Sequence, residues 1–166
     1  MDIRSLRIGD IVTTDGTPVN TKKGEYYEVI NIISDEWWND EKENIKHIGW
    51  VSIKPITDRS EYVGGAWVDY LQPIPITDEL LKSLNAEFVL RNNRGRVYMI
   101  GFCSIQKIIN ADYYTFTAEA GRWKIRTSKH IKYLHELQHE IFDAGVELKK
   151  LNFKRNKDEV INLFFE

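Results

Sequence analysis

The chain of 166 residues lacks several features that define large protein classes. It has one cysteine, Cys103, so no disulfide can form within it, and a reducing compartment such as the cytosol is expected. Residues 97–103 around this cysteine are mostly apolar, which predicts an inert core thiol rather than a nucleophile. No apolar run is long enough to span a bilayer, and the first residues lack the apolar core of a signal peptide, so we expect no membrane association.

Charge of one sign is also scarce. The formal net charge is −2, which gives no global reason to bind nucleic acid. There is no Gly-rich phosphate loop, no Ser-His-Asp order and no internal repeat. We therefore predict no cofactor and no catalytic residue, and we do not assign the protein to the enzymes.

Aromatic and β-branched residues, by contrast, are abundant in the first 72 residues. Residues 25–33 and 45–53 have the composition of strands, and Gly49 in the second of them indicates a bulge. Short strands separated by polar loops predict an SH3-like small β-barrel or a curled sheet over residues 1–72. Residues 58–65 are expected to form a flexible link.

The second part, residues 73–151, is predicted to be α+β. Pro73 and Pro75 hold the junction extended, and Thr77 then caps a short helix. An antiparallel sheet should follow, with a hairpin turn at residues 92–95. Its strands are expected at residues 87–91, 96–103, 113–118 and 122–126, with a returning strand at 146–148.

One long amphipathic helix, residues 128–144, is expected to pack on this sheet. Ser128 is a suitable N-cap, and Gly145 suits the left-handed conformation in which helices commonly end. Apolar residues recur on one half of the helical wheel and charged residues on the other, which is typical of a helix with one buried side.

The same helix contains a His-Glu-x-x-His sequence, which opens an alternative function. His135 and His139 at i and i+4 could both reach a zinc ion, with Glu136 as general base and Glu159 as third ligand. That pattern would indicate a zinc-dependent hydrolase. Only three positions of the motif are fixed, however, and the long side chain of Gln138 stands where such enzymes usually carry a small one. The other interpretation, two half-buried histidines beside a core helix and no metal site, is the one we adopt.

The segment 34–44 is acidic and carries adjacent tryptophans, Trp37 and Trp38. Neighbouring residues of an extended strand point to opposite sides, so at most one of them can pack inward. These rings could form an aromatic platform for a ligand, together with Trp67 and Tyr70, or a loop that closes one end of a barrel. The acidity of the segment argues against a nucleic-acid phosphate at this place.

A basic and apolar tail, residues 152–166, ends the chain. Lysines and an arginine cluster over residues 149–157, so nucleic-acid binding through the tail is a further alternative, although charge runs are usually solvated surface. The last residues are apolar enough to dock on this chain or on a second copy, which leaves a homodimer open.

Four stretches resemble an uncharacterised family of small proteins from Bacteroidota, their prophages and phages. The stretches are LRIGDIV, EYYEVINI, YLQPIPITDELLKSLNAEF and IKYLHELQHEIFDAGVEL. The family brings no established activity, and its pattern has Gln and Asn where this chain has Glu136 and His139. The resemblance thus weakens the zinc hypothesis. The acidic segment and the tail beyond Leu151 fall outside it.

Together these features predict a non-enzymatic binding or accessory protein of a phage or mobile element, located in the cytoplasm of a bacterial host. Its candidate ligand-binding residues are Trp37, Trp38, Trp67 and Tyr70, at an expected concave junction between the two halves. Its ligand would be a small molecule or a host protein, as in counter-defence by sequestering a small nucleotide signal or blocking a defence protein. Aromatic rings can stack on a base, which is the physical basis of the nucleotide version.

Overall fold

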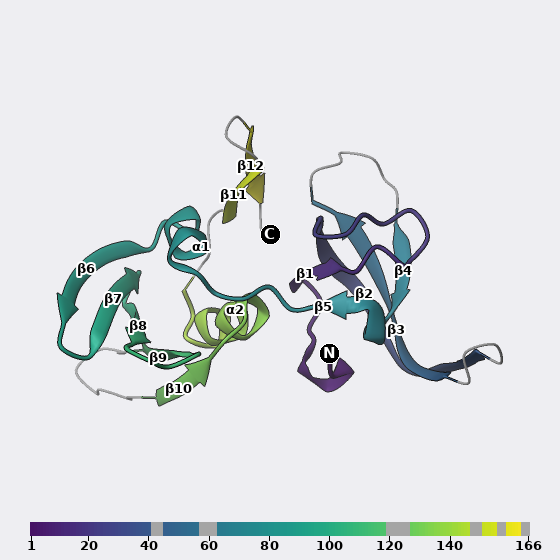
Figure 1. Cartoon of the computed structure of the whole chain (residues 1–166), viewed down its shortest axis with the longest axis horizontal. Helices are drawn as coiled ribbons and strands as arrows, with labels where there is room; N and C mark the ends of the chain where they lie inside the picture. Colours follow the sequence, from purple (N-terminus) through teal and green to yellow (C-terminus); the bar gives the residue numbers. More distant parts are fainter. Residues whose placement is uncertain (41–44, 57–62, 119–126, 147–150, 156–158, 164–166) are drawn as a thin grey trace. The chain divides into compact units, whose positions relative to one another are not determined.

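The computed structural model describes residues 1–40, 45–56, 63–118, 127–146, 151–155 and 159–163 (Figure 1). The chain divides into two compact units, Met1–Ile74 and Pro75–Glu166, each with its own antiparallel five-stranded sheet. Strands dominate and helices are few and short, so the sheet-rich α+β class is confirmed in this coarse form. None of the helices in the described ranges has the length and hydropathy needed to cross a membrane.

The N-terminal unit contains strands in the order β4-β3-β2-β1-β5. Alternate apolar residues of these strands point to one side and form its core, as the period of two in a strand requires. The elements are η1 (Ile3–Ser5), β1 (Ile11–Thr14), β2 (Tyr26–Asp40), β3 (Ile45–Pro55), β4 (Gly64–Trp67), η2 (Val68–Tyr70) and β5 (Leu71–Gln72). The core residues are Leu6, Val12, Tyr27, Val29, Val51, Ile53, Ala66, Val68 and Leu71.

The prediction of a loop at residues 34–44 was wrong for its first part, because β2 continues to Asp40. The pairing of β2 with β3 is interrupted once and then resumes. Ile33 pairs with Trp50 and Trp37 with Ile48, so the three residues of β2 between these pairs lie opposite a single residue of β3. That one residue is Gly49, whose φ of 85° suits glycine. The bulge expected at Gly49 therefore exists, with its extra residues on the facing strand. Residues 41–44 lie outside the described ranges, as do most residues of the expected link at 58–65.

The C-terminal unit has strands in the order β10-β9-β8-β7-β6. Its elements are α1 (Asp78–Ser83), β6 (Glu87–Asn92), β7 (Gly95–Ile100), β8 (Cys103–Ile108), β9 (Tyr114–Ala118), β10 (Thr127–Ile131), α2 (Leu134–Asp143), β11 (Leu151–Arg155) and β12 (Glu159–Leu163). Thr77 Oγ1 accepts the Leu80 N–H at 3.1 Å, which confirms the expected cap of α1.

Both helices cover the same face of the second sheet. Tyr98, Ile105 and Phe116 form a cross-strand row on that face and are almost fully buried. Tyr114 lies on the same face and its hydroxyl donates to Asp78 of α1 at 3.4 Å. Lys129, paired with Phe116 and so also on this face, donates to Glu140 of α2 at 2.5 Å. The sheet is thus buried on one face by helices, the α+β layering that the sequence indicated.

The long helix of residues 128–144 is not formed. Residues Thr127–Ile131 are strand β10, paired along their whole length with β9, and α2 begins at Leu134. The reason lies in Glu136, whose carboxylate accepts the backbone N–H groups of Lys132 (2.6 Å) and Tyr133 (3.1 Å) and so fixes the helix start there. The predicted end is confirmed: Gly145 has φ 73°, and its N–H bonds to the carbonyl of Phe142.

The hairpin around residues 92–95 is confirmed, with Asn92 Oδ1 accepting the N–H groups of Arg94 and Gly95 at 2.8 and 3.0 Å. The strand expected over residues 96–103 was wrong in one respect, because Gly101 at φ 56° reverses the chain and Cys103 begins a separate strand, β8. The strand expected at 122–126 lies outside the described residues, as does most of the one expected at 146–148. Part of the predicted tail forms the β11–β12 hairpin.

Candidate functional site

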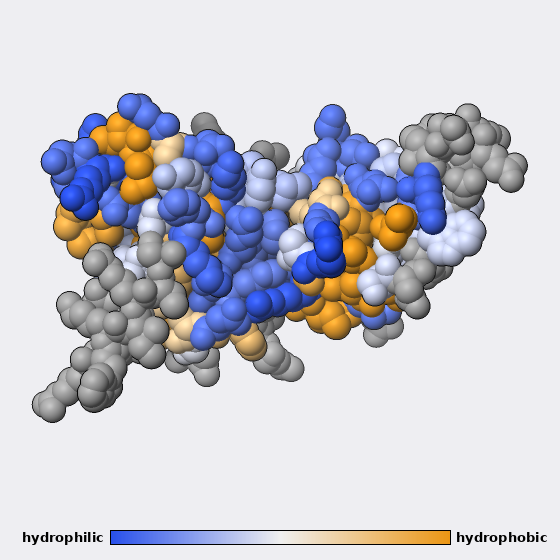
Figure 2. Space-filling model, turned by 90° about the horizontal axis from the view of Figure 1, so that it is seen from below, coloured by the Kyte–Doolittle hydropathy of each residue, from blue (hydrophilic) through white to orange (hydrophobic). Residues whose placement is uncertain are grey.

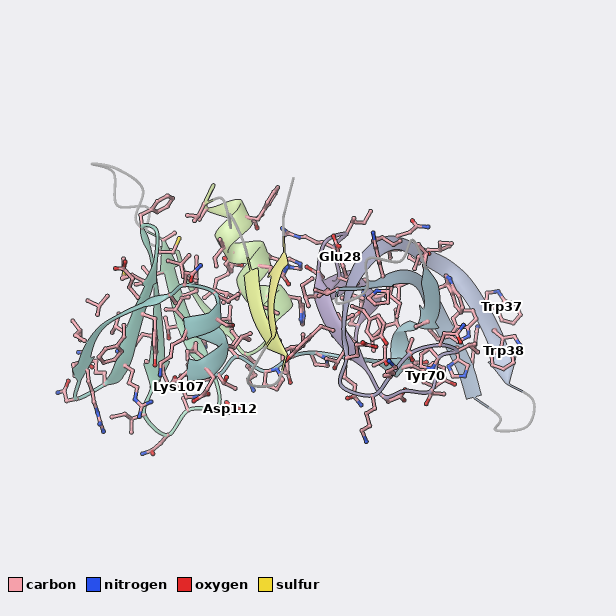
Figure 3. The ribbon with its side chains drawn as sticks, turned by 90° about the horizontal axis from the view of Figure 1, so that it is seen from above. Glu28, Trp37, Trp38, Tyr70, Lys107 and Asp112 are labelled. Carbon is pink, nitrogen blue, oxygen red and sulfur yellow. The ribbon has the colours of Figure 1, made fainter. Side chains whose placement is uncertain are left out.

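The two adjacent tryptophans of β2 lie on opposite faces of the N-terminal sheet. Trp38 pairs directly with His47 of β3, whereas Trp37 pairs with Ile48. Because cross-strand partners share a face and neighbours along a strand do not, Trp38 and His47 point to one side and Trp37 to the other. Both tryptophans are solvent-accessible, with 47% of Trp38 and 62% of Trp37 exposed (Figure 3).

On the Trp38 side, four aromatic rings from four elements, β2, β3, β4 and η2, meet. The rings of Trp38, His47 and Trp67 lie within 22° of parallel, and their centroids are separated by 5.5, 5.9 and 6.4 Å. Tyr70 of η2 adds a tilted ring 5.2 Å from His47. We call Trp38, His47, Trp67 and Tyr70 the aromatic cluster. It contains three of the four predicted ligand-binding residues; Trp37 does not belong to it.

A buried imidazole lies at the centre of this cluster and has both ring nitrogens occupied. His47 is 2% exposed; its Nδ1 lies 3.1 Å from Asp69 Oδ2 and its Nε2 3.4 Å from the hydroxyl of Tyr70. A carboxylate can only accept, so Nδ1–H donates to Asp69, and in the neutral tautomer Nε2 accepts from Tyr70. The chain Asp69–His47–Tyr70 therefore fixes the imidazole in one orientation and leaves neither nitrogen for a metal or a substrate.

The spacing of the rings determines how a ligand could use them. A flat group inserted between two parallel rings needs about 7 Å between them, twice the usual carbon contact distance of ~3.5 Å. The centroids of Trp38 and Trp67 are 6.4 Å apart, and both rings also contact His47. The cluster is thus filled, and the surface that it offers is the exposed part of Trp38, held from behind by His47.

The rear of the cluster is built by close packing against a glycine. Trp50 meets Trp67 edge-on, with centroids 4.9 Å apart and planes at 77°. A Cβ on Gly65 of β4 would lie 2.0 Å from Cζ2 of Trp50, so only glycine leaves room for this indole. Trp50 in turn supports Trp67 in the cluster.

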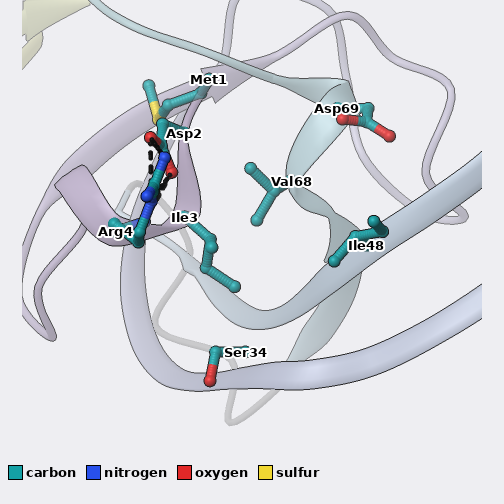
Figure 4. A pocket seen from close by; sticks show the side chains of 8 residues that line it. All are labelled: Met1, Asp2, Ile3, Arg4, Ser34, Ile48, Val68 and Asp69. Atoms are coloured by element: carbon teal, nitrogen blue, oxygen red, sulfur yellow. Dashed lines mark hydrogen bonds and ion pairs between the residues drawn. The ribbon is translucent and has the colours of Figure 1, made fainter.

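An open cleft of about 620 Å³ lies in the same unit, between η1 and the strands (Figure 4). Its lining is partly apolar, with Ile3, Ile48 and Val68, and partly charged, and its volume is within the range of small-molecule sites. Figure 2 shows hydrophobic and hydrophilic residues side by side on the surface of the N-terminal unit. Asp69 lines this cleft and also accepts the bond from His47, so one carboxylate connects the cleft to the aromatic cluster. None of the four predicted ligand-binding residues lines the cleft.

The charges of the cleft are unequally matched. Arg4 binds Asp2 through two nitrogens, at 2.8 and 3.2 Å, and this contact, followed more weakly by the terminal ammonium of Met1, lowers the pKa of the Asp2 carboxyl. The side chain of Asp69 is half-exposed, and the bond to His47 is the one ion-pair contact that it makes among the described residues. The cations of the cleft thus act on Asp2, and Asp69 has an imidazole as its partner.

The His-Glu-x-x-His segment of α2 has a different environment. His135 is 3% exposed, its Nδ1 is buried without a hydrogen-bond partner, and burial lowers its pKa. The rings of His135 and His139 are 6.0 Å apart at 75°. Glu136, the expected general base, directs its carboxylate to the backbone at the start of the helix. No group of three potential metal ligands occurs among the described residues, and the side chain of Glu159 lies outside them.

Two members of this site were not predicted from the sequence. His47 occupies an inward position of β3, between outward-facing Lys46 and Ile48, and Asp69 is a single acid beside Tyr70. Their meeting depends on the β2–β3–β4 register and on η2, which no local pattern reveals. Of the basic cluster at residues 149–157, the structure describes only the backbone of β11 (Leu151–Arg155), so the cluster brings no further site residue.

Comparison of the chain with models of protein families, with curated proteins and with solved structures gives no match. Function must therefore be argued from the residues of the site.

Proposed function

We propose that the protein is a non-enzymatic binding protein whose N-terminal unit recognises a ligand or partner through the exposed ring of Trp38. The observation that carries this proposal is a large aromatic side chain that is half-exposed and yet held rigidly. Trp38 rests on His47, which is itself buried and bonded at both nitrogens. A rigid aromatic surface loses little conformational entropy on binding, which is why tryptophan is favoured at recognition sites.

The neighbouring cleft supports the same proposal. It places apolar side chains and the carboxylate of Asp69 beside the cluster, a combination suited to a ligand with both an apolar and a polar part. His47 is unsuited to direct proton transfer with a substrate, because only 2% of it is exposed and a substrate atom could not reach its ring nitrogens. These features favour recognition over catalysis at this place.

A phage or mobile-element origin, a cytoplasmic location and a counter-defence role are finer parts of the proposal. The resemblance of four stretches of the chain implies the phage or mobile-element origin and the counter-defence role. The lone, buried Cys103 supports the cytoplasmic location. We likewise propose that the first sheet belongs to the SH3-like barrels. This assignment is supported by its five antiparallel strands and by the bulges in β2, which bend a sheet. Homodimerisation through the tail remains a prediction.

The test is a comparison of Trp38→Ala with Trp37→Ala. The two residues are neighbours in one strand and similarly exposed, but only Trp38 belongs to the aromatic cluster. A panel of nucleosides, nucleotides, aromatic compounds and small cations is screened by thermal shift against the full chain and both variants. We expect a ligand response that Trp38→Ala abolishes and Trp37→Ala preserves. Equal losses in both variants, or no response to any compound, would refute the proposal.

A further inference from the structure

The two tryptophans of β2 differ in one property besides their side of the sheet. Lys46 places its ammonium 5.0 Å from the ring centroid of Trp37, within the range of a cation–π contact. Among the described residues, no lysine or arginine makes such a contact with Trp38. Within the described part of the chain, one indole is thus already paired with a lysine, and the other presents its ring without such a partner.

The nearby carboxylate of Asp69, like Trp38, has no lysine or arginine as a partner among the described residues. Asp69 bonds to His47, the ring on which Trp38 stacks, and half of its side chain is exposed. Its partner among the described residues is an imidazole and not a lysine or arginine, while Arg4 of the cleft is bound to Asp2. An exposed indole and a carboxylate that has no lysine or arginine partner among the described residues therefore both contact the same imidazole, that of His47.

We infer that the aromatic cluster recognises an organic cation, and specifically an alkylated ammonium group placed over Trp38 with Asp69 as its counter-charge. This inference rests on the proposed function and names its ligand class. The negative face of an indole attracts a cation, and the methyl groups of a quaternary ammonium fit an apolar ring better than a hydrated inorganic ion does. The rings of the aromatic cluster leave no space for a ligand between them, but Trp38 exposes part of its ring to solvent. A compact ammonium group can bind to such a single ring surface.

An anionic ligand would meet the opposite field. A phosphate near Asp69 would be repelled, and the nearby cation Arg4 is engaged with Asp2. The inference thus separates a cationic ligand from the nucleotide signal that the sequence alone allowed.

The experiment compares choline with 3,3-dimethylbutan-1-ol, which has the same shape without the charge. Binding to the full chain is followed by NMR through the indole N–H signals of the five tryptophans, with the Trp38 signal assigned from Trp38→Ala. We expect choline to bind at least about tenfold more tightly than the alcohol, a difference of about 1.4 kcal/mol. The two affinities are measured on the unmodified protein, and the variant serves only to assign the Trp38 signal.

Variants then locate the charge effect. Asp69→Asn should reduce the preference for choline to about onefold, and Asp112→Asn, a surface acid of the other unit paired with Lys132, should preserve it. If choline and the alcohol bind equally and Trp38→Ala abolishes both, the cation inference is overturned and the proposed function stands. If AMP binds more tightly than adenosine, the cation inference is overturned as well. If no probe affects Trp38, both proposals fall.

The same head group could belong to a free metabolite or to a modified side chain of a protein. A short peptide that carries one trimethyllysine distinguishes these sources within the same titration. Binding at least tenfold tighter than that of choline would indicate a protein source, and equal or weaker binding a small molecule.

Discussion

The substitution Gly65→Ala tests the packing on which the aromatic cluster depends. The added methyl group would lie 2.0 Å from Cζ2, 2.6 Å from Cε2 and 2.9 Å from Cη2 of Trp50, far inside contact distance. The backbone of Gly65 lies outside the left-handed region, so any cost arises from this clash alone. Trp50 is a rigid ring packed on Trp67, and overpacking of this kind costs roughly 1–3 kcal/mol.

The assay is urea unfolding of the full chain followed by far-UV circular dichroism, because tryptophan fluorescence would report on the substituted region itself. The same destabilisation would also appear on heating, because in a unit of this size each loss of 1 kcal/mol lowers the melting temperature by roughly 4–8 °C. The matched control is Trp50→Ala, which removes the atoms that clash. Gly65→Ala should be costly in the natural background and nearly neutral with Trp50→Ala, so the two changes should show a coupling energy of about 1 kcal/mol or more. Equal costs in both backgrounds would refute the reasoning.

Three further results are expected from the C-terminal unit. Glu136→Ala should lower the free energy of unfolding by about 1 kcal/mol, since the side chain accepts two backbone N–H groups at the start of α2, whereas a general base could be replaced without such a loss; urea unfolding measures this loss, and unchanged stability would contradict it. Burial lowers the pKa of His135, so the unfolded state binds more protons than the folded state at mildly acidic pH. The free energy of unfolding should therefore fall as the pH decreases below about 6.5, by at most ~1.4 kcal/mol per pH unit. His135→Gln should flatten this dependence, and the same slope in both proteins would exclude His135 as the cause. Burial raises the pKa of the Cys103 thiol to about 11, so a thiol reagent at pH 8 should react with the native protein at least 100-fold more slowly than with the unfolded chain; comparable rates would contradict its burial.

Local patterns were sufficient for several elements of the fold. Thr77 as the cap of α1, the Asn92–Gly95 turn and the end of α2 at Gly145 each depend on interactions within a few residues. A residue type that favours one local conformation can be recognised without knowing its distant neighbours. Burial of Cys103 was likewise predicted from the apolar residues around it.

Errors arose where a distant partner decided the conformation. Ser128 is a good helix cap in isolation, yet it pairs with Thr117 of β9, and Glu136 starts the helix further along. Residues 34–40 have the polarity of a loop, but the chain continues as strand β2 because residues 37–40 pair with β3. The site shows the same limit, because His47 and Asp69 gain their meaning only from the register that brings them together.

The irregular pairing of β2 with β3 has a consequence for sequence change in this hairpin. A slip of β2 by one residue would normally move every side chain to the other face. Here such a slip would bring Trp37 opposite His47 in place of Trp38, because the two indoles are consecutive. The duplication therefore makes the indole surface tolerant of a one-residue insertion at the bulge, whereas a one-residue deletion would bring Asn39 opposite His47 and remove the indole from that side.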